Sequence, residues 1–213
     1  MSASWLSTAE LDTELVARHT RAWVTRAVVG LNLCPFAKAP LVKGQVRFVV
    51  STARDVPALL LQLADELRHL AQADPAETET TLLIHPQVLA DFSDFNEALD
   101  AVDSLVDALG LEGVLQVASF HPQYQFAGTD ADDMSNATNR SPYPTLHLLR
   151  EASIERAVEA FPEPEAIVDA NLRTLDALGA EGWKALASQC RIDAFIAPTT
   201  PMRSSEPTEP EPP

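Results

Sequence analysis

Two short stretches decide the fold: Thr80-Thr-Leu-Leu-Ile-His-Pro86 and Val114-Leu-Gln-Val-Ala-Ser-Phe-His-Pro122. Each is a run of apolar and β-branched residues that ends in histidine and then proline. Such runs favour β-strands, and proline ends a strand because it removes the next N–H from the hydrogen-bond ladder. The sequence therefore predicts that His85 and His121 stand at the C-terminal ends of two strands.

The stretches around these strands predict an alternation of strands and helices. A third strand is expected at 46–50, and helices at 57–71 and 93–109 separate the three strands. Crossovers of this length favour parallel strands. Further helices are predicted at 11–29 (after a capping box, Ser7 to Glu10), 144–160, 164–178 and 181–188, with a last short strand at 192–196.

We therefore predict an α/β fold with a small, mainly parallel sheet flanked by helices and a helical C-terminal part. Residues 1–198 are expected to form one domain. Residues 199–213 are rich in Pro, Glu and Ser and are expected to be a disordered tail.

The amino-acid composition and net charge indicate which classes of molecule the protein can bind. The 213 residues are 46% hydrophobic, enough for a sizeable core, and the formal net charge is −16. Because such a surface repels nucleic acid phosphates and anionic lipid, we expect no nucleic acid and no membrane partner. Without an apolar run of membrane-spanning length or a secretory signal, and with only two cysteines, the chain is expected to be cytoplasmic. The expected partner is a small molecule, and the oligomeric state stays open.

His85 and His121 are the leading candidates for a functional site. On parallel strands both imidazoles would lie at the carboxyl edge of the sheet, where open α/β sheets bind ligands. Even with one strand between them, they are close enough to share a ligand or a metal ion. The alternative is that each histidine ends its strand and bonds to a loop carbonyl.

The polar segment between His121 and Tyr143 is long for a structureless loop, which indicates a functional or a disordered segment. Its aromatic residues favour a folded lid over the same edge. We expect Asp130 to act as a base or a cation ligand, although a solvated acidic turn is the alternative. Gln125, Asn139 and Arg140 are expected to bind substrate, with Arg140 holding an anionic group.

Three further positions complete the predicted site. His147, Arg150 and Glu151 share one face of the helix predicted at 144–160, so His147 is a candidate third metal ligand beside His85 and His121, and Arg150 a candidate substrate ligand. Cys34 is a candidate nucleophile or redox thiol, with a small buried hydrophobe as the alternative. Asn32 beside it is a candidate for binding substrate.

Four stretches together resemble a known family: 32–37 (NLCPFA), 43–45 (KGQ), 120–127 (FHPQYQFA) and 139–147 (NRSPYPTLH). In this order they are similar to the bacterial and plant family called domain of unknown function 1415, over about residues 11–186. The family label carries no established activity, so the resemblance implies no catalytic residues.

From these observations we expect the protein to be an enzyme that acts on a small polar or anionic molecule at the carboxyl edge of the sheet. Two imidazoles and a carboxylate suit a divalent metal cofactor or, without metal, acid–base chemistry. Two alternatives stay open: a protein that binds a metabolite or metal without turnover, and thiol chemistry at Cys34 with a histidine as base.

Overall fold

A four-stranded mixed sheet forms the centre of the protein in this computed structural model, which describes residues 11–159 and 165–196. The strands are β1 (Val46–Val50), β2 (Thr80–Ile84), β3 (Leu115–Phe120) and β4 (Thr145–Arg150), in the order β1-β2-β4-β3. β1 and β2 are parallel, and β4 runs antiparallel to both of its neighbours. β1, β2 and β3 consequently point the same way.

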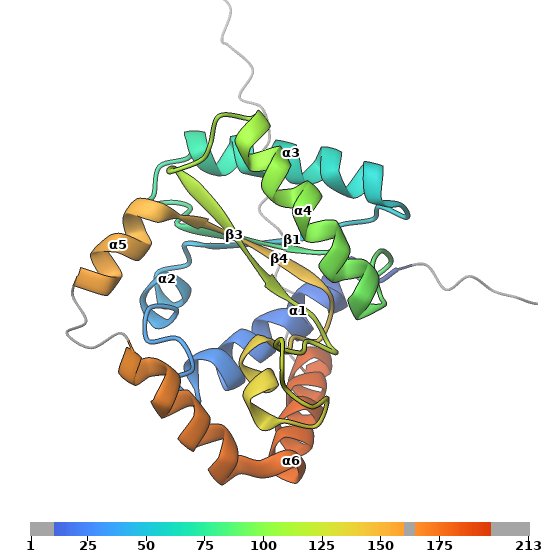
Figure 1. Cartoon of the computed structure of the whole chain (residues 1–213), viewed down its shortest axis with the longest axis vertical. Helices are drawn as coiled ribbons and strands as arrows, with labels where there is room; N and C mark the ends of the chain where they lie inside the picture. The colour runs from blue at the N-terminus through green and yellow to red at the C-terminus, as the bar shows by residue number, and fades with distance from the viewer. Residues whose placement is uncertain (1–10, 160–164, 197–213) are drawn as a thin grey trace, which may run out of the picture.

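Helices cover both faces of the sheet (Figure 1). α3 (Val56–Gln72) and α4 (Phe92–Ala108) pack on one face, where Leu63, Leu67 and Phe95 are fully buried against Leu83 and Leu146. α1 (Thr13–Trp23), the π-helix η1 (Val24–Val29), α2 (Lys38–Val42) and part of α6 (Glu165–Ile196) lie on the other. Alternate residues along each strand face the two helical layers, so the sheet is buried as a three-layer α/β fold.

The prediction of a mainly parallel sheet is wrong because β4 was taken for a helix. The sequence after Pro144 has leucines and charged residues at helical spacing, and a proline favours the first turn of a helix. In the structure residues 145–150 instead fill the gap between β2 and β3, where they pair on both sides. Helix α5 (Glu151–Glu159) begins only after this strand. Tertiary pairing has overridden local preference here.

The C-terminal part is helical, as predicted, but residues 192–196 belong to α6 and not to a strand. The break predicted between two helices is present as a kink at Gly179, whose φ of 65° suits glycine. The predicted tail at 199–213 and the capping box at Ser7 to Glu10 lie outside the described residues. In the described part of the chain, no helix is long and apolar enough to cross a membrane.

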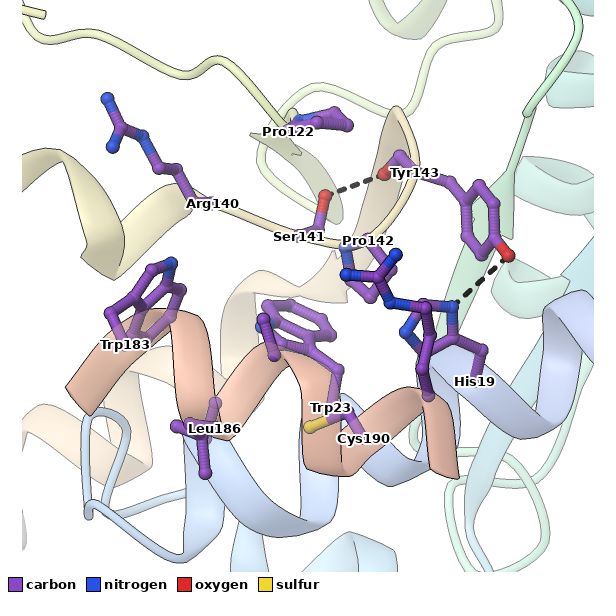
Figure 2. Close-up of a pocket in the computed structure, with 13 residues that line it drawn as sticks. His19, Trp23, Pro122, Arg140, Ser141, Pro142, Tyr143, Trp183, Leu186 and Cys190 are labelled. Carbon is purple, nitrogen blue, oxygen red and sulfur yellow. Dashed lines mark hydrogen bonds between the residues drawn. The ribbon is translucent and has the colours of Figure 1, made fainter. Parts of the chain in front are cut away.

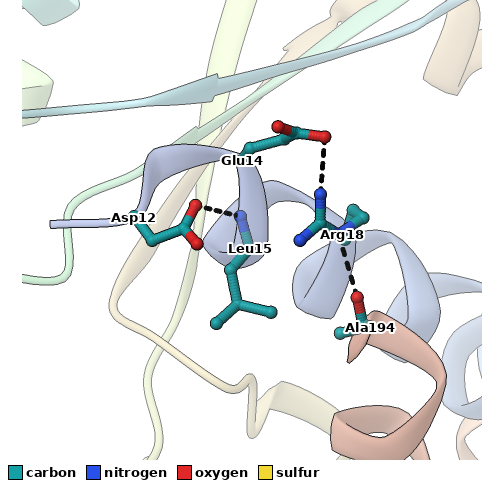
Figure 3. A network of polar contacts seen from close by, with 5 residues as sticks. All are labelled: Asp12, Glu14, Leu15, Arg18 and Ala194. Carbon is teal, nitrogen blue, oxygen red and sulfur yellow. Dashed lines mark hydrogen bonds and ion pairs between the residues drawn. The ribbon is translucent and has the colours of Figure 1, made fainter. Parts of the chain in front are cut away.

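α1 is fixed at its start and against the end of α6 (Figure 3). The Asp12 carboxylate accepts a hydrogen bond from the Leu15 N–H at 2.8 Å and caps the helix. Arg18 pairs with Glu14 at 2.5 Å, and its Nε donates to the carbonyl of Ala194 at 2.9 Å. These contacts hold α1 beside the last turns of α6, and that placement forms the pocket described below.

Candidate functional site

His85 and His121 lie at the same edge of the sheet, because they follow the C-terminal ends of β2 and β3. Both residues are fully buried. His85 Nδ1 lies 2.9 Å from the carbonyl of Val88, and His121 Nε2 lies 3.3 Å from the carbonyl of Leu89. Each ring is therefore held by a carbonyl of the loop that follows β2.

Aromatic rings fill the space around this pair. Phe95 stacks on His85 with ring centroids 5.8 Å apart and contacts His121 at 5.1 Å. Burial lowers the pKa of both histidines, that of His85 to about 4, and the Nε2 of His85 is buried with no partner in the described part of the chain. Neither ring lines the pocket between α1 and α6 or the pocket on the opposite face of the sheet. These contacts favour the alternative in which the histidines hold the loops, and their catalytic roles stay a prediction.

His147 stands on the opposite face of the sheet, because it lies on β4 between Leu82 of β2 and Ala118 of β3. Its Nε2 is 2.8 Å from the Thr80 hydroxyl, and burial lowers its pKa to about 4. The three imidazoles predicted to share a metal ion are thus divided by the sheet. Within the described residues, no three His, Cys, Asp or Glu side chains are grouped as a metal site would require.

The segment after β3 is folded around Asn136, a fully buried residue of the 3-10 helix η2 (Met134–Asn139). The Asn136 Oδ1 accepts hydrogen bonds from the Phe126 N–H and the Thr129 hydroxyl, each at 2.9 Å, and its Nδ2 donates to the Asp130 carbonyl at 2.8 Å. Asp130 itself is exposed. The structure does not bring its carboxylate into the cluster around His85.

The predicted substrate-binding residues mostly contact the backbone. Gln125 donates to Thr129, and Asn139 donates to the Ser119 carbonyl at 3.1 Å and so ties η2 to β3. Arg150 donates to the carbonyls of Leu70, Ala73 and Thr78 at 2.7–3.0 Å and satisfies carbonyls at and beyond the end of α3. Asn32 has a positive φ of 55° in the turn after η1 and is exposed.

Cys34 is half-buried in the turn before α2 and lines the larger of the two pockets. Burial raises the pKa of its thiol, although the N–H groups of Phe36 and Ala37 act in the opposite direction. Because the thiolate is the nucleophile, this environment does not favour the thiol hypothesis.

A pocket of about 380 Å³ lies at the carboxyl edge, between the segment entering β4 and helices α1 and α6 (Figure 2). We call it the edge pocket. Figure 2 shows the indoles of Trp23 and Trp183 on one side, Ser141 and Pro142 opposite them, and His19 beside Tyr143. Its lining comprises these six residues with Ala27, Pro122, Arg140, Leu186, Ala187, Cys190 and Arg191.

The charges of the edge pocket differ from those of the whole chain. The net charge of the protein is −16, yet the described residues that line the pocket include two arginines and a histidine and no carboxylate. Arg140 is held by the loop, since its guanidinium donates to the carbonyls of Tyr124 and Ala131. Arg191 is exposed and forms no hydrogen bond or ion pair with the described part of the chain. Within the residues that the structure describes, its positive charge is therefore not neutralised by an ion pair.

His19 and Tyr143 form the polar pair of this pocket. The His19 Nδ1 is 3.1 Å from the Tyr143 hydroxyl, and the two rings meet edge to face. Burial, and then the charge of Arg191, lower the pKa of His19, while burial raises the pKa of Tyr143. At neutral pH both rings are uncharged, so the pair can accept a proton at one ring and donate one at the other.

The edge pocket lies at the same edge of the sheet as the site predicted from the sequence, but most of its lining was not among the predicted residues. Arg140 and the 121–143 segment were predicted there, whereas His19, Trp23, Trp183 and Arg191 were not singled out. His19 and Tyr143 are 124 residues apart in the chain, and no spacing pattern connects them. The sequence shows that His19, Trp23 and Trp183 lie on predicted helices. It does not show that these helices pack together, so it gives no sign of a shared pocket.

Comparisons with known proteins identify the family of this chain but do not indicate a function. No curated protein and no solved structure matches the chain. A family model described as a protein of unknown function (DUF1415) matches residues 15–185 and confirms the resemblance seen in the sequence motifs. This match spans most of the chain, and the protein therefore belongs to the DUF1415 family.

Proposed function

We propose that this protein is an enzyme that binds a small planar anion in the edge pocket and transfers protons through His19 and Tyr143. The observation that carries the proposal is the charge of the lining: among the described residues it contains Arg191 and Arg140 and no carboxylate, in a chain of net charge −16, and the acid that acts on the pair is Asp12, whose charge reaches Tyr143. Pockets of a few hundred Å³ with apolar walls and a few convergent polar groups are typical small-molecule sites.

The shape and chemistry of the lining suggest the class of ligand. The half-buried rings of Trp183 and Tyr143 offer flat aromatic surfaces that suit a ring or another planar group, and the buried indole of Trp23 backs the pocket wall. The guanidinium of Arg191, which pairs with no carboxylate among the described residues, suits a carboxylate or phosphate, which it can hold with two parallel hydrogen bonds. The preferred ligand is therefore planar and carries one anionic group.

The reaction that fits the pair is a proton transfer next to the anionic group, as in an isomerisation or an elimination. With its Nδ1–H donating to the Tyr143 oxygen, neutral His19 accepts a proton from a C–H bond at Nε2, and the phenol of Tyr143 donates its proton to the oxygen or carbon where electron density accumulates. The Nδ1 proton then passes to the phenolate across the 3.1 Å contact, which returns both rings to their neutral forms. Such a reaction needs no nucleophile and no metal, so it does not depend on His85, His121 or His147.

Binding is tested by titration with benzoate, followed by tryptophan fluorescence. We expect benzoate to quench the emission saturably and benzamidine, its cationic analogue of the same shape, to have no effect. Arg191→Ala should weaken benzoate binding about tenfold, the order expected for losing one charge-assisted contact. Arg68→Ala on α3, an exposed arginine on the far side of the sheet, is the matched control. Equal responses to benzoate and benzamidine would contradict an anion site.

Turnover is tested separately, in D₂O, with a panel of planar carboxylates that have an acidic C–H group. NMR should detect deuterium entering that position in the presence of the protein. His19→Gln and Tyr143→Phe should abolish the incorporation while benzoate still binds. If compounds that bind never exchange their protons, the protein binds without turnover, and the catalytic part of the proposal fails.

A further inference from the structure

A second, larger pocket of about 710 Å³ opens on the face of the sheet that carries His147, and we call it the sheet pocket. Its floor includes a row across three strands, Leu82, His147 and Ala118, which are paired partners. η1, the 34–40 segment and α5 form the walls. Its lining is mainly apolar. Apolar clefts of this size that carry a few polar groups are typical small-molecule sites.

The sheet pocket is polar at one end and apolar at the other. Thr80, Gln116 and Arg150 line it where β2 and β3 begin and β4 ends. Phe120 and Trp23 line it toward the opposite edge, where their rings pack 5.5 Å apart. An elongated ligand would therefore place its apolar part over the floor and its polar end at the amino edge.

Positive charge predominates at the polar end. Arg150 and Arg156 line it with one acid, Glu79. The Nε of Arg150 is buried and has no hydrogen-bond partner in the described part of the chain, whereas its terminal nitrogen is occupied by three carbonyls. This nitrogen is closed to solvent, so a ligand would meet the charge of Arg150 through space and make its direct contact with the exposed Arg156. His147 cannot supply a charge, because its pKa is about 4.

We propose that the sheet pocket binds a single-chain carboxylate, with its alkyl chain over Leu82, His147 and Ala118 and its head at Arg150 and Arg156. This site is separate from the edge pocket, although Trp23 lines both. The proposal does not depend on the proposed function, and either can fail alone.

The experiment measures affinity by calorimetry for hexanoate, octanoate, decanoate and dodecanoate. We expect the dissociation constant to fall about fourfold for each added methylene until the pocket is full. Carboxylates should bind about tenfold more tightly than the primary alcohols of the same length, because the alcohols cannot pair with the arginines. No binding across the series, or equal binding of acids and alcohols, would overturn the proposal.

Variants locate the site. Ala118→Leu should weaken decanoate binding at least tenfold by filling the floor, and Arg156→Gln should reduce the preference for acids over alcohols. Ala101→Leu, an exposed position on α4, is the matched control. Decanoate should also slow the alkylation of Cys34 by N-ethylmaleimide, since Cys34 lines this pocket. Unchanged alkylation under saturating decanoate, or displacement of decanoate by benzoate, would place the ligand elsewhere.

Discussion

Replacing Asn136 by leucine is expected to lower the free energy of unfolding by about 3 kcal/mol and to weaken benzoate binding as well. The side chain is fully buried, and its amide makes three hydrogen bonds to the segment between β3 and β4. Leucine has a similar size but leaves those partners unpaired, at about 1–3 kcal/mol for each buried group. Part of that cost is recovered because Phe126 and Asp130 are near solvent.

The loss of binding follows from the position of Asn136. The segment that it holds together runs from Pro122 to Arg140, and both of these residues line the edge pocket. Urea unfolding and the benzoate titration measure the two effects. Gln123→Ala, an exposed position in the same segment, is the matched control and should change neither quantity. A stable leucine variant would show that the amide network contributes little.

Acidification is expected to destabilise the protein through two imidazoles, that of His85, which is fully buried, and that of His147, which is half-buried in the sheet. The pKa of His85 and that of His147 are each lowered to about 4, mainly by burial, from an ordinary value of 6.5. Below pH 6.5 the two histidines become protonated in the unfolded chain but stay neutral in the folded protein. The free energy of unfolding therefore falls as the pH falls, and the loss levels off near pH 4, where the folded protein is protonated as well. A difference of about 2.5 pKa units corresponds to roughly 3 kcal/mol for each ring.

The test compares variants, because carboxylates also titrate in this range. Urea unfolding at pH 7.5 and pH 4.5 gives the acid-induced loss for the wild type and for His147→Gln. The variant should lose about 2–3 kcal/mol less than the wild type over this interval. His69→Gln, an exposed histidine on α3, is the matched control and should behave like the wild type. An equal loss in wild type and His147→Gln would mean that this ring titrates normally in the folded protein.

The elements that the sequence predicted well are those with strong local signals. β1, β2 and β3 are short apolar runs bounded by turn residues, and α3 and α4 begin close to the predicted positions. β4 was missed because Thr145 to Arg150 has no local preference for a strand that exceeds its helical spacing. Residues 145–150 form a strand because they can pair with both β2 and β3. This pairing depends on residues elsewhere in the chain and cannot be read from the segment itself.

Some features of the candidate site could be predicted from the sequence and others could not. The carboxyl edge could be inferred from the direction of β2 and β3, and the folding of the 121–143 segment from its aromatic residues. The edge pocket also needs Trp183 and Arg191 from α6, whose approach to α1 depends on tertiary contacts such as Arg18 to Ala194. His85 and His121 stood out in the sequence because they end strands, and that position gave them loop carbonyls as partners.

An NMR titration of the labelled protein with benzoate tests the anion site most directly. The account predicts that the ring signals of His19 and the indole N–H signals of Trp23 and Trp183 shift together with one dissociation constant. The ring signals of His85 and His147 should not shift. Shifts confined to His85 or His147, or no shifts at millimolar benzoate, would contradict the placement of an anion between α1, α6 and the strand entering at Tyr143.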